Sequence, residues 1–364
     1  MIAMALDHTR DYFSNLRFQP EDLSRSNPAL FFTRWITHFC APSFFLLAGI
    51  GAALSLSRGR SKRDLSWFLF TRGLWLVFLE ITVLHFAWNF AIGFPVFLLV
   101  IWALGLSMIV LAALIFLPEP VIAAVSLVTI LGHNLLDGFR PTDPNIVAGL
   151  WTVLHVPRMA LPGIFFVGYP LIPWFAVMAL GFTLGRVYQW DAPARKRFLL
   201  ITGAAAFAAF LVLRGFNLYG NPQPWTPQST PAMTVASFLN VLKYPPSLHY
   251  LLMTLGPALI LLAVFERVRG RFADIVSVYG KVPFFYYVLH LFLIHSLAYG
   301  FAMWQGGSGS FLSLDTSSFP TWYGTSLAGV YVAWLIVIAL LYLPCRMYAD
   351  FKRRRTDLKW TSYL

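Results

Sequence analysis

The feature that constrains this chain most is a series of long apolar stretches that carry almost no charge. The stretch from Leu98 to Leu117 contains no charged residue and has the roughly 20-residue length of a helix that crosses a bilayer. Of the 364 residues, 58% are hydrophobic and only 12% are charged, about half the charged fraction of a typical soluble protein. The sequence therefore predicts an all-α fold, a polytopic transmembrane helical bundle.

Ten apolar segments follow one another along the chain, and each is predicted to form a membrane helix. They are Met1–Phe13, Leu30–Leu56, Trp67–Phe90, Pro95–Leu117, Val121–Leu136, Gly163–Gly185, Phe198–Leu218, Leu248–Phe265, Val282–Met303 and Tyr323–Leu343. The first is short, because a helix of this length spans about 20 Å and the hydrocarbon core is about 30 Å thick. We therefore expect a truncated first helix, or a native start upstream of Met1.

Positive charge falls in alternate loops of this pattern. Lys and Arg gather within residues 58–63, 186–197, 267–271 and 346–355. Cytoplasmic loops carry such an excess, so we expect both termini to be cytoplasmic and the basic clusters to face the lipid bilayer. This distribution argues against a nucleic-acid partner for the net charge of +12. Residues 1–345 are predicted to form the transmembrane domain, and residues 346–364 a basic cytoplasmic tail.

Ionisable side chains follow directly behind the apolar start of the chain, in the run Asp7-His8-Thr9-Arg10-Asp11. Such groups are costly at membrane depth unless they are paired or face a cavity, so they are candidates for function. His8 is the first choice for a general base, because an imidazole takes up and returns a proton near neutral pH. The alternative is a polar helix end that meets water.

Two later helices supply further candidates. His38 follows Arg34 by about one helical turn, and Arg34 suits a phosphate or a carboxylate, or else extends towards the membrane surface. His290 lies near the middle of its predicted helix. His295 is expected instead to make an interhelical hydrogen bond.

Arg158 and Lys243 lie in predicted outer loops beside proline-rich turns. Each could hold an anionic acceptor or the phosphates of a thioester substrate, or serve as an interfacial anchor. The sequence contains no HExxH or CxxC motif and no carboxylate cluster. His290 and His295 are five residues apart, a spacing that does not place both on one helix face, so no metal is expected.

Several of these stretches resemble the bacterial membrane proteins related to the catalytic domain of heparan-alpha-glucosaminide N-acetyltransferase. The resemblance covers nearly the whole chain and is most specific at residues 4–13 (MALDHTRDYF) and 32–42 (FTRWITHFCAP). Residues 169–174 (YPLIPW), 243–248 (KYPPSL) and 287–290 (YVLH) fit the same family. It implies a transmembrane acyltransferase of the bacterial cytoplasmic (inner) membrane. Such proteins move an acyl group from cytoplasmic acyl-CoA to a sugar on the far side.

The resemblance also bears on His8. In related bacterial O-acyltransferases a functional His follows an Arg by eleven residues, and His8 is similar to that His. The Arg would precede Met1 in this sequence. The lysosomal enzyme carries Asn where His8 stands.

The resemblance and the membrane histidines together lead to one expected function. It is transfer of an acetyl or other acyl group from acetyl-CoA or another acyl-CoA to a hydroxyl or amine of an extracytoplasmic glycan or glycolipid. His8 would be the general base, tuned by Asp7 or Asp11.

The other candidates would assist. His38 or His290 would stabilise the developing charge or orient the thioester. Arg34 or Arg158 would give electrostatic support, and Arg10 and Lys243 are further candidates for substrate binding.

Two other functions stay open at this point. The same His and Asp residues could relay protons in a proton-coupled transporter or flippase. The chain could also be an inactive structural relative, and whether it forms a homodimer is open as well.

Overall fold

The computed structural model describes residues 1–141, 146–160, 163–355 and 357–363. The described residues form two compact units whose segments alternate along the sequence. Unit 1 comprises residues 1–40, 82–92 and 268–364, and unit 2 comprises residues 41–81 and 93–267. Helices make up most of both units, which confirms the predicted all-α class.

Seven helices in the described part of the chain are long and apolar enough to cross a membrane. They are Pro28–Ser57, Lys62–Asn89, Glu119–Leu136, Ala192–Gly215, Leu248–Phe265, Pro283–Trp304 and Leu327–Arg354. Each contains most of a predicted apolar segment, although Ala192–Gly215 begins six residues before the predicted Phe198 and Leu327–Arg354 ends eleven residues after the predicted Leu343. The chain is thus a polytopic helical membrane protein.

The predicted segment Gly163–Gly185 is only partly helical. Its first half contains the strand β3 (Phe165–Val167), and the helix α9 begins at Trp174. Pro170 and Pro173 lie between the two elements and lack the N–H groups that a continuous helix needs. The prediction that Gly163–Gly185 forms a single membrane helix was therefore wrong, although the segment is apolar.

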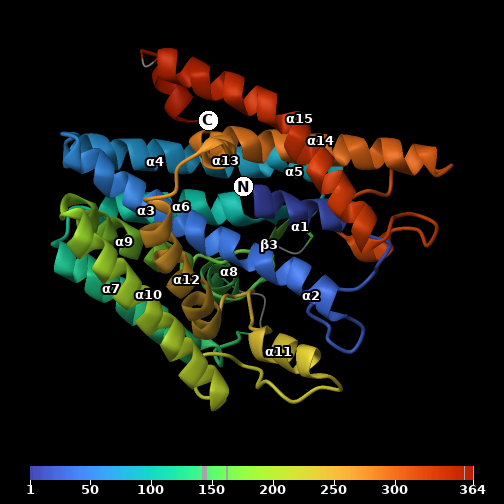
Figure 1. Ribbon diagram of the computed structural model, residues 1–364, viewed down its shortest axis with the longest axis horizontal. Coiled ribbons are helices and arrows are strands. Elements are labelled where there is room, and N and C mark those ends of the chain that lie inside the picture. Colours follow the sequence, from blue (N-terminus) through green and yellow to red (C-terminus); the bar gives the residue numbers. More distant parts are fainter. Residues whose placement is uncertain (142–145, 161–162, 356, 364) are drawn as a thin grey trace. The chain divides into compact units, whose positions relative to one another are not determined.

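Unit 1 is built around the first and last helices of the chain. α1 lies against both α14 and α15 (Figure 1), and Trp334 Nε1 donates a hydrogen bond to the Ile2 carbonyl (2.9 Å). The helices of the unit are α1 (Ile2–Phe13), α2 (Pro28–Trp35), η1 (Ile36–Phe39), α5 (His85–Asn89), α13 (Arg271–Lys281), α14 (Pro283–Trp304), η5 (Thr316–Ser318), α15 (Leu327–Arg354) and η6 (Lys359–Ser362). α15 continues past the start of the predicted tail, of which Thr356 and Leu364 lie outside the described residues.

Unit 2 pairs α4 with α6 and α10 with α12, and α9 contacts both α6 and α7. Its helices are α3 (Cys40–Ser57, whose first residue belongs to unit 1), α4 (Lys62–Leu79), α6 (Val100–Leu114), α7 (Glu119–Gly132), η3 (His133–Leu136), α8 (Ile146–Leu154), α9 (Trp174–Leu184), η4 (Gly185–Gln189), α10 (Ala192–Gly215), α11 (Pro231–Leu239) and α12 (Leu248–Phe265). A π-helical turn, η2 (Glu80–Leu84), joins α4 to α5.

A small sheet of three strands completes unit 2. β3 pairs in parallel with β1 (Val96–Leu98) and antiparallel with β2 (Arg158–Ala160). Its core consists of Val96, Leu98 and Val167, against which Val153 of α8 packs.

Helix starts follow local sequence signals in both units. The Asn27 side chain accepts a hydrogen bond from Leu30 N and Pro28 occupies the first turn of α2, an arrangement that favours helix initiation. Ser247 likewise caps α12 by accepting from Tyr250 N.

Glycines allow α3 and α9 to approach closely within unit 2. A Cβ atom built on Gly181 would lie 2.2 Å from the Leu46 carbonyl oxygen, and one on Gly185 would lie 2.3 Å from Ala53 Cβ. Trp174 is fully buried in the same helix and stacks on Phe45, with ring centroids 4.6 Å apart. These residues therefore serve packing, as small residues do between membrane helices.

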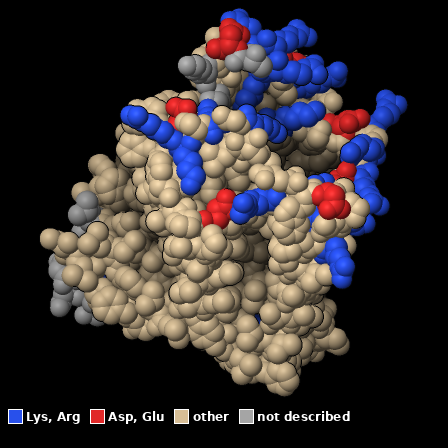
Figure 2. Space-filling model, turned by 90° about the vertical axis from the view of Figure 1, so that its left-hand side faces the viewer, with Lys and Arg blue, Asp and Glu red and all other residues tan. Residues whose placement is uncertain are grey.

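Positive charge is unevenly spread over the surface. Figure 2 shows Lys and Arg side chains crowded over part of the face that it draws, beside broad areas of other residues. Arg58, Arg60, Lys62 and Arg63, one of the predicted cytoplasmic clusters, are all exposed. The side of the membrane that each loop and terminus faces stays a prediction.

Candidate active site

The polar run near the N-terminus lies in α1, and most of it is buried inside unit 1. Asp7 and Arg10 are 9% and 6% exposed, and Thr9 is fully buried with its hydroxyl donating to the Ala5 carbonyl (2.7 Å). A bare membrane helix end that meets water would leave these groups exposed. The run is therefore part of an internal polar site.

His8 forms a pair with His290 of α14. His8 Nδ1 and His290 Nε2 are 2.7 Å apart, and the two rings stack with centroids 4.9 Å apart. The residues are separated by 282 positions in the sequence, so the packing of α1 on α14 creates the pair. His290 is completely buried, whereas His8 is partly exposed.

The surroundings of His290 define which nitrogen of His8 can act as a base. His290 Nδ1 lies 3.0 Å from the Tyr286 carbonyl oxygen, which can only accept a hydrogen bond. A neutral His290 must therefore carry its proton on Nδ1 and present a lone pair at Nε2. His8 must then donate from Nδ1, and its own lone pair is left on Nε2.

Aromatic rings surround this histidine pair. The Trp88 ring meets His8 nearly edge-on at a centroid distance of 4.7 Å, and Tyr287 lies 6.3 Å from His8 and 5.4 Å from His290. Trp88 is held in turn by Tyr12, whose hydroxyl donates to the Trp88 carbonyl. The histidine pair thus lies among aromatic rings in surroundings of low dielectric constant, where electrostatic interactions are stronger than in water.

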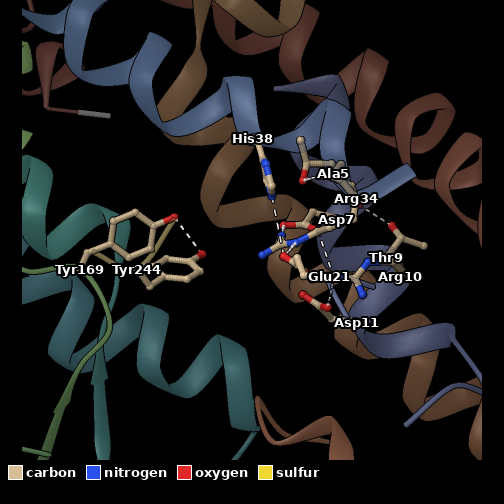
Figure 3. A network of polar contacts seen from close by, with 11 residues as sticks. Ala5, Asp7, Thr9, Arg10, Asp11, Glu21, Arg34, His38, Tyr169 and Tyr244 are labelled. Atoms are coloured by element: carbon tan, nitrogen blue, oxygen red, sulfur yellow. Dashed lines mark hydrogen bonds and ion pairs between the residues drawn. The ribbon is translucent and has the colours of Figure 1, made fainter. Parts of the chain in front are cut away.

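The charged residues of α1 form a network with the second predicted helix (Figure 3). Arg34 Nη1 pairs with Asp7 Oδ2. Arg10 Nη2 lies 3.1 Å from Asp7 Oδ1 and 2.6 Å from Asp11 Oδ1. The two guanidinium groups therefore share the Asp7 carboxylate, which ties α1 to α2.

Glu21, in the loop between α1 and α2, completes the network. Its Oε1 accepts a hydrogen bond from Arg34 Nε (2.7 Å) and lies 3.7 Å from His38 Nε2. Burial alone would raise the pKa of Glu21, but the charge of Arg34 and the neighbouring His38 outweigh it, and the pKa lies well below its usual value. Glu21 therefore stays ionised, and three carboxylates accompany two guanidinium groups.

The structure places most of the predicted site residues in unit 1, in two groups. One is the pair of His8 and His290, and the other is the charged network that contains Asp7, Arg10, Asp11, Arg34 and His38. His295 donates a hydrogen bond from Nδ1 to the Ala87 carbonyl (3.0 Å) and stacks on Phe90. That contact links α14 to α5, which is the interhelical role expected from the sequence.

Arg158 and Lys243 belong to unit 2. Arg158 is exposed and donates from Nη1 to the Pro141 carbonyl (3.0 Å). Lys243 is 8% exposed, and its Nζ lies 5.0 Å from the centre of the Tyr244 ring. The Tyr244 hydroxyl is in turn 3.3 Å from that of Tyr169.

Four further residues with notable contacts were not singled out from the sequence, two in unit 1 (Glu21 and Trp88) and two in unit 2 (Glu80 and Arg214). Glu21 and Trp88 carry no local signal, because a loop carboxylate and a membrane tryptophan are both common. Glu80 and Arg214 do carry one, since each is an isolated charge in an apolar run. Glu80 accepts from Leu99 N (2.9 Å) at the start of α6, and buried Arg214 donates to four backbone carbonyls around α11.

A comparison with protein families adds an independent observation. Residues 1–219 match the family described as "Heparan-alpha-glucosaminide N-acetyltransferase, catalytic". The chain belongs to this family. The matched part contains α1, α2 and the whole charged network, and the resemblance read from residues 4–13 and 32–42 is thereby confirmed.

Membership of the N-acetyltransferase family indicates the general activity. The family is one of acetyltransferases, and the seven apolar helices make this member an integral membrane protein. The search of curated proteins found no match.

Proposed function

We propose that the protein is a membrane acetyltransferase that uses cytoplasmic acetyl-CoA to acetylate a hydroxyl or amino group of an extracytoplasmic glycan or glycolipid. A bacterial cytoplasmic (inner) membrane is the proposed location. The observation that carries the proposal is the His8–His290 pair, together with the family match. The family description names an alpha-glucosaminide, so a glucosaminide is the first acceptor to try.

His8 acts as the general base in this proposal. As the acceptor oxygen or nitrogen attacks the thioester carbonyl, the acceptor proton moves to His8 Nε2, which carries the lone pair. The acceptor–carbon bond forms and the carbon–sulfur bond breaks, and the thiolate of coenzyme A leaves. The proton on His8 then passes to that thiolate, so that the neutral imidazole is restored.

His290 supports His8 in two ways. Its Nε2 accepts the Nδ1 proton of His8 and so keeps the His8 lone pair on Nε2 (2.7 Å). It also stabilises the imidazolium that forms on His8 during the reaction, because hydrogen bonds from a charged donor are stronger than neutral ones. This is the role that a triad carboxylate plays for histidine in hydrolases.

The charged network positions the helix that carries His8. Asp7, Arg10, Asp11 and Arg34 pair with one another, and their interactions join α1 to α2. Since both guanidinium groups already hold carboxylates, we assign Arg10 and Arg34 to positioning and not to the phosphates of coenzyme A. His38 adjoins Glu21 at the end of this network and is assigned the same role.

Arg158 and Lys243 remain candidates for contact with an anionic substrate, because both side chains are positively charged. The family match does not favour the alternative of a proton-coupled transporter or flippase.

The direct test is release of the coenzyme A thiol from acetyl-CoA by the purified full chain in detergent, with a glucosaminide as acceptor. We expect release in the wild type and a loss of at least 100-fold, on the order of a general base's contribution, in His8→Ala. His249→Ala is the control, because His249 is a buried histidine of unit 2, where it contacts the Tyr219 carbonyl. Undiminished release in a folded His8→Ala variant would reject the role of His8.

A further inference from the structure

A cavity in unit 2 lies beside the short helix α8, well away in sequence from the histidine pair. Its volume is about 250 Å³. Residues before, within and after α8 line it: Arg140, Trp151, Thr152, Val156, Pro157 and Arg158. Two arginines thus border a pocket whose other walls are mostly apolar.

Both guanidinium groups are held in place without being neutralised by the described part of the chain. Arg140 donates from Nε to the Asp137 carbonyl (3.2 Å), and Arg158 donates from Nη1 to the Pro141 carbonyl (3.0 Å). A guanidinium has five N–H donors, so each arginine keeps further donors for a ligand. Among the described residues, no carboxylate forms an ion pair with either arginine.

The nearest acidic side chain in the described sequence is already engaged. Asp137 Oδ1 lies 2.8 Å from His155 Nε2, and its Oδ2 accepts a hydrogen bond from Asn134 (2.9 Å). These contacts lower the pKa of Asp137 despite the opposing effect of burial. Among the residues that the structure describes, the positive charge of the cavity is therefore left without an acidic partner.

The outer side of α8 is strongly apolar. Ile146, Val147 and Leu150, which share one helix face, are 82%, 53% and 58% exposed. Leu135 and Phe139, which precede the cavity-lining Arg140 in the sequence, are 76% and 51% exposed. In a membrane protein, side chains of this kind contact lipid.

The opposite side of α8 is fixed to unit 2. The carbonyls of Val153 and Leu154 accept hydrogen bonds from Leu171 N (2.8 Å) and Ile172 N (2.7 Å). The Trp151 ring lies 5.1 Å from the ring of His155, which is completely buried. The apolar face of α8 is therefore presented from a fixed support beside the two arginines, and little ordering of the helix is needed on binding.

We propose that this cavity binds the phosphate group of a membrane lipid. The phosphate lies between the guanidinium groups of Arg140 and Arg158, whose planar forks match phosphate oxygens. The acyl chains run along the exposed face of α8. A free phosphate ion has no apolar part that could contact the exposed face of α8. A phospholipid has both a phosphate and acyl chains, so it is the ligand proposed.

This site does not depend on the catalytic role of His8 proposed above. It lies in unit 2, uses none of the residues around His8, and would exist in a protein with no catalytic activity. Its test therefore measures binding and not turnover.

The experiment is native mass spectrometry of the purified full chain, which counts lipids that stay bound. The probes are phosphatidylglycerol, a diacylglycerol with the same acyl chains but no phosphate, and inorganic phosphate as a competitor. The test variant is Arg140→Gln/Arg158→Gln. The matched control is Arg58→Gln/Arg63→Gln, which removes two exposed arginines of the same unit at the connection between α3 and α4.

We expect one phosphatidylglycerol to bind at least tenfold more tightly than the diacylglycerol. The test variant should lose this preference and the control variant should keep it, since charged hydrogen bonds each contribute about tenfold or more in affinity. Equal retention of both lipids by the wild type would overturn the proposal, because apolar contact alone would then explain binding. Equal loss in both arginine variants would overturn it as well, because it would reveal a general charge effect, and tight binding of inorganic phosphate alone would exclude a lipid as the specific ligand.

Discussion

Replacing His290 with Leu tests the geometry of the histidine pair. Leu fills a similar volume in the buried site but cannot accept the proton of His8 Nδ1, which lies 2.7 Å from His290 Nε2. His8 then loses the partner that fixes its tautomer and stabilises its charged form. Gln at the same position would still accept that hydrogen bond through its side-chain oxygen.

The size of the effect follows from one hydrogen bond. A hydrogen bond from a charged donor is worth about 1.5–3 kcal/mol, and each 1.36 kcal/mol of barrier is a factor of ten in rate. We therefore expect His290→Leu to lower kcat by about 10- to 150-fold with little change in KM. His290→Gln should recover part of that loss.

The assay is steady-state release of the coenzyme A thiol at saturating acetyl-CoA, with the melting temperature of each variant measured alongside. His295→Leu is the control, because His295 is buried in the same helix but contacts the Ala87 carbonyl and the Phe90 ring. It should lower stability without a comparable loss of kcat. A folded His290→Leu variant with wild-type kcat would refute the assignment of His290.

Two further predictions concern the scaffold. The pKa of Glu21 is lowered in the folded protein, so its stabilising effect is present above its unfolded pKa of about 4.3 and is lost as the pH falls through the folded value. Thermal melts should therefore show Glu21→Gln less stable than wild type at pH 7, with the difference shrinking at pH values below about 4; a difference that grows on acidification would contradict this sign. Gly181→Ala should destabilise unit 2 by about 1–3 kcal/mol, because its Cβ would lie 2.2 Å from the Leu46 carbonyl oxygen. Gly51→Ala, whose Cβ meets open space, should cost nothing in the same melts, and equal effects of the two would contradict the close approach of α3 and α9.

The membrane helices could be predicted from the sequence because their signal is local. The predicted segment Leu248–Phe265 coincides with α12, and Val282–Met303 differs from α14 by one residue at each end. The same reasoning failed for Gly163–Gly185, which contains the strand β3, and for the start of Pro95–Leu117, which contains the strand β1 before α6 begins at Val100. Hydrophobicity alone does not distinguish the two, since buried strands and helices are equally apolar.

The candidate residues of the site could be found from the sequence, but their pairing could not. Ionisable groups in apolar segments pointed to His8, Arg34 and His290. The contact between His8 and His290 depends on how α1 and α14 are rotated relative to each other. The sequence of neither helix determines this rotation. The engagement of Arg34 by Glu21 depends similarly on the path of a loop.

The central claim is that the protein transfers an acetyl group from acetyl-CoA on one side of the bilayer to an acceptor on the other. The full chain would be reconstituted into vesicles with isotopically labelled acetyl-CoA on one side and a glucosaminide on the other, for wild type and His8→Ala. We predict that mass spectrometry finds labelled acetyl on the acceptor with wild type only, together with release of the coenzyme A thiol. Equal labelling by the two proteins would contradict the role of His8, and a proton-driven movement of the glucosaminide without any thiol release would contradict acetyl transfer itself.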